Sequence, residues 1–196
     1  MRILRFIFFL TTAGILAACG SNQQPATAAM ADSTLTQPLY PFPQYLANEL
    51  AYLDSMPLVV ERTVRENGVT VDSGMMDKAS FKQAIAFFTS IDPNTKALRP
   101  KYEESSFNDL SIEALTFSIS ATDASLPLQQ ADVLLHPSTQ QVKSVALQLQ
   151  QQSPDSSITT RVLWKHHMKC QLAQTIAYTD GRSINRITEF VWDKPL

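Results

Sequence analysis

The chain has 196 residues, of which 44% are hydrophobic and 17% are charged, and its formal net charge at pH 7 is −2. This length is enough for one domain with a substantial buried core. The mildly acidic balance argues against a nucleic acid partner, because phosphate binding needs a basic patch. The glycines form no phosphate-binding loop, and no G-x-S-x-G motif marks a catalytic serine.

The first 18 residues have the pattern of a secretory signal peptide. Arg2 and Arg5 supply a positive start, and a short apolar segment follows them. This segment is shorter than the roughly 20 apolar residues that span a bilayer. It ends in small residues that directly precede Cys19. A basic start, a short apolar core and small residues at the end are typical of a cleaved export signal.

The four residues Leu16–Cys19 resemble the lipobox of bacterial lipoproteins. In that family, acyl chains such as palmitate are attached to the cysteine, and signal peptidase II cleaves just before it. The resemblance implies that Cys19 is the lipidated first residue of the mature protein, and several acyl chains on one residue make a stable anchor. Gly20 favours the outer membrane, because in enterobacteria an Asp there favours inner-membrane retention. The alternatives are a conventional cleaved signal with a chance cysteine, and a transmembrane helix.

The chain is therefore expected to have three parts. Residues 1–18 form the signal peptide, 19–38 the lipidated N-terminus and flexible tether, and 39–196 a single α+β domain. The segment after the cysteine carries few large apolar side chains, as is typical of a disordered linker.

Export has two consequences for charge and thiol chemistry. Loss of Arg2 and Arg5 with the signal changes the formal charge from −2 to −4. Acylation of Cys19 leaves Cys170 without a partner for an intrachain disulfide. We expect Cys170 to be buried as a small hydrophobic residue, with intermolecular pairing or a reactive thiol as the alternatives.

Apolar periodicity predicts two helices in the first half of the domain. The first covers 43–54, where three leucines recur on one face. The second runs from about 78 to 90, and Asp77 is positioned to cap its N-terminus. The leucines of the first helix are Leu46, Leu50 and Leu53.

Between the helices, two β-rich runs at 58–66 and 69–75 flank the dipeptide Asn67-Gly68. Both of these residues tolerate a positive φ, so the dipeptide between β-forming residues is a strong hairpin signal. The sequence therefore predicts an early β-hairpin.

Residues 93–112 are predicted to be a polar connection with one helical turn near 99–104. From residue 113 the hydrophobic period changes from 3.6 to 2, which predicts six strands joined by short turns. Apolar and polar residues alternate along them, so one face is packed and the other is wet. These strands centre on Leu115–Ile119, 128–136, Val145–Leu149, Ile158–Trp164, Leu172–Tyr178 and 184–192.

Together the elements predict an α+β fold in which two N-terminal helices pack on a curved, mainly antiparallel sheet of six to eight strands. The apolar stripes of the helices need a surface that buries them, and the packed face of the sheet supplies it. An open half-barrel would leave room for a ligand, whereas a filled one would not.

One local cluster of metal-competent residues stands out: His166, Met168 and Cys170. On one straight strand they would share a face and suit a soft ion such as Cu(I). A strand from 157 to 178 would be far longer than is usual, so a turn near 166–169 is expected to separate them. We therefore expect no metal site and no cofactor.

Three short segments resemble a group of uncharacterised small lipoproteins of Bacteroidota-type bacteria. They are Tyr52–Pro57 at the end of the first helix, Ser106–Leu110 in the connection and Trp164-Lys165 late in the sheet. That group has no assigned activity, so the resemblance implies architecture and envelope location.

The expected function is a non-enzymatic binding or structural role at the membrane, with an envelope protein or a lipid as partner. The alternative is a carrier or sensor that binds an apolar small molecule or lipid in the concave face of the sheet. Aromatic residues would line that pocket, or would otherwise fill one another's space as core. These residues are Phe81, Phe88, Trp164, Phe190 and Trp192.

Overall fold

Helix α1 (Phe42–Ser55) opens the folded part of the chain in this computed structural model, which describes residues 37–192. The predicted signal peptide, Cys19 and most of the predicted tether lie outside the described residues. Helix α2 (Lys78–Thr89) begins after Asp77, whose carboxylate accepts a hydrogen bond from the Ser80 backbone N–H at 2.9 Å. Both predicted helices and the predicted cap are confirmed.

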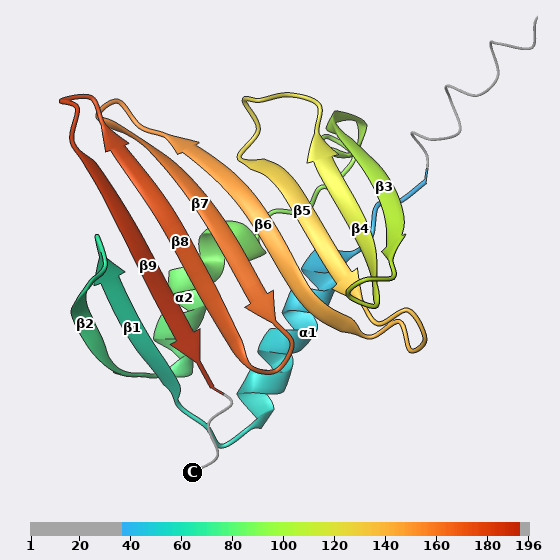
Figure 1. The fold of residues 1–196 in the computed structure, drawn as a ribbon, viewed down its shortest axis with the longest axis horizontal. Coiled ribbons are helices and arrows are strands. Elements are labelled where there is room, and N and C mark those ends of the chain that lie inside the picture. Colours follow the sequence, from blue (N-terminus) through green and yellow to red (C-terminus); the bar gives the residue numbers. More distant parts are fainter. Residues whose placement is uncertain (1–36, 193–196) are drawn as a thin grey trace, which may run out of the picture.

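The rest of the described chain forms one open antiparallel sheet of nine strands (Figure 1). The strand order is β2-β1-β9-β8-β7-β6-β5-β4-β3, so each strand from β3 to β9 lies beside its neighbour in sequence. A short 3-10 helix, Arg99–Lys101, precedes β3. The strands are β1 (Val60–Glu66), β2 (Val69–Met76), β3 (Tyr102–Asp109), β4 (Ala114–Ala121), β5 (Leu128–Leu135), β6 (Val142–Gln152), β7 (Ser156–Lys165), β8 (Lys169–Tyr178) and β9 (Ser183–Val191).

The first hairpin extends the sheet beyond the last strand of the chain. β1 pairs antiparallel with β9, with Val64 opposite Thr188, and β2 forms the outer edge. The turn between β1 and β2 has Asn67 and Gly68 at φ values of 49° and 87°, the left-handed geometry that this dipeptide favours. The predicted hairpin is therefore confirmed.

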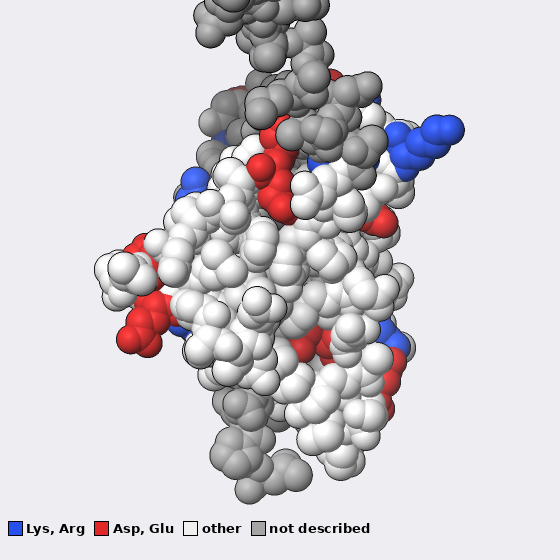
Figure 2. Space-filling model, turned by 90° about the vertical axis from the view of Figure 1, so that its right-hand side faces the viewer, with Lys and Arg blue, Asp and Glu red and all other residues white. Residues whose placement is uncertain are grey.

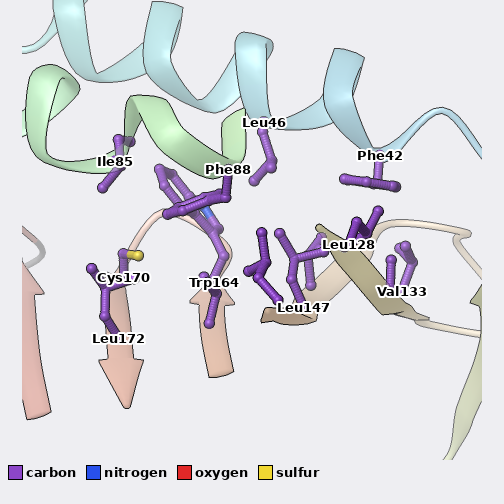
Figure 3. Packing of buried hydrophobic residues seen from close by; sticks show 14 of the residues in the cluster. Phe42, Leu46, Ile85, Phe88, Leu128, Val133, Leu147, Trp164, Cys170 and Leu172 are labelled. Atoms are coloured by element: carbon purple, nitrogen blue, oxygen red, sulfur yellow. The ribbon is translucent and has the colours of Figure 1, made fainter. Parts of the chain in front are cut away.

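Both helices lie on the same face of the sheet, and the core fills the layer between them (Figures 1 and 3). Phe42 on α1 lies above Leu128 and Val133 from β5, and Ile85 on α2 lies above Cys170 from β8 (Figure 3). All five of these side chains are buried. The period-2 apolar pattern thus supplies one continuous surface for the two helical stripes.

Two expectations about the sheet were wrong. The sheet has nine strands, not six to eight, and the additional strand is β3, which occupies 102–109 of the predicted polar connection. Only the helical turn near 99–104 of that connection is confirmed. β3 is an edge strand in which Tyr102 alone is buried, so it lacks the alternation that reveals a half-buried strand.

Within residues 37–192, neither helix is long and apolar enough to cross a membrane.

Candidate functional site

A buried carboxylate marks the point where α1 crosses the turn between β7 and β8. Glu49 is 3% exposed and shares the buried face of α1 with Phe42, Leu46 and Leu53. Leu50, which the sequence placed on this stripe, is only half-buried. A buried carboxylate is unfavourable unless it is paired and hydrogen-bonded. We therefore expect neighbouring donors to offset the cost of burying the charge of Glu49.

Each carboxylate oxygen of Glu49 has two partners. Oε2 accepts hydrogen bonds from the indole Nε1 of Trp164 at 3.1 Å and from the backbone N–H of His167 at 2.9 Å. Oε1 lies 2.9 Å from Nδ1 of His166 and 3.2 Å from Nε2 of His167. Oε2 is therefore fixed by neutral donors, and Oε1 faces two imidazole rings.

The two histidines come from the turn that joins β7 to β8. His167 has a φ of 54°, and its ring stacks on His166 with centroids 3.8 Å apart. The ring of Tyr52 from α1 also stacks on the His167 ring, with centroids 3.8 Å apart. The histidine side chains are 40% and 41% exposed, so the site opens to solvent on their side.

This turn confirms the predicted break in the strand. Met168 is largely exposed and Cys170 is buried, so His166, Met168 and Cys170 do not share a face. The turn is held at both ends, because the His166 N–H donates to the Lys143 carbonyl and the Met168 carbonyl accepts from the Trp192 N–H.

The hydroxyl of Tyr45 completes the cluster at 3.0 Å from Nδ1 of His166. Burial raises the pKa of Tyr45 far above its usual range, and the negative charge of Glu49 and a hydrogen bond to it raise that pKa further. The phenol therefore keeps its proton and acts as a donor. With a proton, Nδ1 of His166 can donate to Glu49 but cannot accept from Tyr45. Glu49 therefore needs a donor at this nitrogen, whereas the Tyr45 hydroxyl needs an acceptor.

The five aromatic residues predicted to line a ligand pocket are brought together in the core. The Phe81 ring lies 5.1 Å from Phe190, 5.5 Å from Trp192 and 6.2 Å from Trp164. Phe88 is buried with them on α2. These rings pack against one another as the interior of the domain, and Phe190 also borders a hollow of about 500 Å3 near β1 and β2.

Cys170 is a buried free cysteine among the described residues. Burial raises the pKa of its thiol well above the usual range, which leaves little of the nucleophilic thiolate. Its packing in the hydrophobic cluster agrees with the expectation of a small core residue.

The sequence did not identify the central residue of this cluster. Glu49 lies 117 positions before His166 and within a helix predicted from its apolar spacing alone. Glu49 follows Leu46 by three positions and precedes Leu53 by four, which places it on the core-facing side. A charged residue on the core-facing side of a predicted helix is the sequence pattern that indicates a buried polar site.

The assembled groups could serve as ligands for a cation. Glu49, His166 and His167 each offer one ligand atom, and these atoms lie within 4.8 Å of one another. A second feature is a hollow of about 820 Å3 beside the start of α1, lined in part by Leu39, Tyr40 and Phe117. No family model, no curated protein and no solved structure matches the chain.

Proposed function

We propose that the chain is a lipid-anchored envelope protein whose domain binds a protein partner and has no catalytic role. The lipobox resemblance of Leu16–Cys19 supports the anchor, because acylation of Cys19 would hold the domain at a membrane. The edge strand β2 supports the binding role and is the observation that carries it.

β2 is an outer strand of the sheet, and seven of its eight residues are exposed. Val69, Val71 and Met75 are each more than half exposed. An edge strand offers unpaired backbone donors and acceptors, and natural proteins usually protect such an edge with lysine, proline or inward-pointing charge. β2 contains neither lysine nor proline. An irregularity at Val71 interrupts its register with β1, and the exposed apolar residues on either side of it suit the strand to pairing with another chain.

The opposite edge differs from β2 in its charge. β3 carries three acidic residues, Glu103, Glu104 and Asp109, and both acidic and basic groups are visible on this side of the molecule (Figure 2). β2 carries a single charged residue, Asp72, which is paired with Arg62. Charge therefore discourages strand addition at β3 and leaves β2 as the favoured edge.

The occupant we propose for β2 is an extended segment of an envelope protein. Strand addition supplies affinity through main-chain hydrogen bonds and specificity through side chains that alternate along the edge. The described chain begins beside β3, at the other end of the sheet (Figure 1). The tether would therefore join the domain at the edge remote from β2, which leaves β2 accessible to a partner.

Site-specific photocrosslinking tests this role. A photoreactive residue at Met75 of the full-length protein in its native envelope should give a discrete adduct with one protein. The double substitution Val71→Lys and Met75→Lys should abolish co-purification of that protein, because edge lysines oppose strand pairing. Both side chains are exposed, so the substitutions should change stability by no more than about 0.5 kcal/mol each.

The matched control is the exposed Phe107 on β3. A photoreactive residue there should not give the same adduct, and Phe107→Lys should leave co-purification unchanged. Equal adducts from both edges, or none from β2, would contradict a docking role for this strand.

A second candidate is the carriage of an apolar small molecule, which the hollow beside the start of α1 favours in place of the curved face of the sheet. Its volume of about 820 Å3 lies within the usual range of ligand sites, roughly 300–1,000 Å3. The rings of Tyr40 and Phe117 meet there at 5.0 Å. Native mass spectrometry of protein extracted from membranes should show a bound molecule that Phe117→Asp removes. A spectrum of protein alone would count against a carrier.

A further inference from the structure

We propose that Glu49, His166 and His167 form a binding site for a divalent transition metal ion, with zinc as the best fit. The site lies where the β7–β8 turn meets α1 and uses none of the residues assigned to partner binding at β2. The two proposals therefore succeed or fail separately.

The separations between the ligand atoms are somewhat shorter than those of a coordination shell, so an ion would move the ligands apart by a few tenths of an ångström. Bonds of about 2.0–2.2 Å place the ligands of a tetrahedral zinc ion roughly 3.3–3.6 Å apart. Oε1 of Glu49 lies 2.9 Å from Nδ1 of His166 and 3.2 Å from Nε2 of His167. All three atoms lie within 4.8 Å of one another. The two rings stack at an interplanar angle of 25°, so binding requires the partly exposed rings to tilt until both nitrogen lone pairs point at one ion.

The ligand groups are already oriented by their neighbours. Trp164 and the His167 backbone N–H hold Oε2 of Glu49, which directs Oε1 toward the imidazoles. Tyr52 stacks on the His167 ring with an interplanar angle of 11° and restrains it beside Glu49. Such outer contacts position metal ligands and raise affinity.

The local charge also favours a cation. Glu49 is buried, and the ionisable groups that pair with it are two imidazoles. An ion between Oε1 and the two nitrogens would compensate the buried charge, and Nδ1 of His166 would then use its lone pair on the metal.

The donor set selects the kind of metal. Two imidazoles and one carboxylate suit zinc and its transition-metal neighbours, whereas magnesium and calcium prefer oxygen ligands. Three protein ligands leave a further position, and the exposed side of both histidines makes it reachable by water or by a group from a bound molecule.

Isothermal titration of the full-length chain in detergent with Zn²⁺ tests the site. One zinc ion should bind per chain, and Mg²⁺ should not compete. Glu49→Gln and His166→Ala should each weaken zinc binding by at least about tenfold, because each removes a ligand of a three-ligand site. Cobalt in place of zinc should give the intense visible bands of a four-coordinate ion, and both variants should lose them.

The matched control is His136→Ala, since the chain has three histidines and His136 is exposed at the end of β5. This variant should bind zinc as the wild type does. Circular dichroism and melting curves identify any variant that does not fold. His166→Ala is the decisive variant, because the His166 side chain is partly exposed whereas Glu49 is buried. Absent zinc binding, or equal affinity in wild type and His166→Ala, would overturn the proposal.

Discussion

Replacement of Trp164 by alanine is expected to lower the free energy of unfolding by about 3–5 kcal/mol, the range seen for large aromatic residues in cores. Trp164 is 0% exposed and packs against Phe81 and Trp192. Its indole also donates to the buried Glu49, so the substitution leaves both a cavity and a carboxylate that has lost a donor. Urea denaturation followed by circular dichroism measures the loss.

Two further variants separate the loss of packing from the loss of the hydrogen bond and provide an exposed control. Trp164→Phe keeps most of the packing and removes the donor to Glu49, so its loss should be smaller than that of alanine. Phe107→Ala removes an exposed aromatic side chain and should change stability by no more than about 0.5 kcal/mol. Equal losses for Trp164→Ala and Phe107→Ala would contradict the assigned core.

Replacement of Cys19 by alanine is expected to remove the acyl anchor and release or mislocalise the protein. The described domain begins after this position, at residue 37, so its melting temperature should not change. Fractionation of cells, together with metabolic labelling by a fatty acid, measures the loss of membrane attachment and of acylation. A variant that is cleaved before position 19 and stays membrane-bound to the same extent as the wild type would contradict the anchor.

Local signals predicted most of the elements because local physics decides them. Asn67-Gly68 fixes a hairpin through its positive φ angles, and Asp77 fixes the start of α2 through its hydrogen bond to the Ser80 N–H. Alternation along β7 and β8 follows from burial on one face. Such signals do not specify the order of strands in the sheet. The pairing of β1 with β9 brings the two ends of the domain together, and no local sequence pattern predicts it.

Edge position explains the strand that the sequence did not predict. β3 pairs with β4 alone, and residues such as Glu103 and Ser106 are exposed along it. Without a buried face, its sequence resembles that of a polar connection. The number of strands was underestimated for the same reason.

The candidate metal site was only half visible in the sequence. His166 and the turn near it were recognised from the sequence, and on a straight strand its neighbour His167 would point in the opposite direction. The positive φ of His167 instead stacks the two rings, and the third group, Glu49, comes from a distant helix. Tertiary packing, which sequence spacing does not encode, makes this constellation.

The central claim is that this domain is held at a membrane by a lipidated Cys19. The most direct test is the mass of the N-terminal peptide of the wild-type protein extracted from membranes of its native host. The account predicts a peptide that begins at Cys19 and carries two or more acyl chains. A peptide that retains any of residues 1–18, or that begins elsewhere without acyl chains, would contradict it.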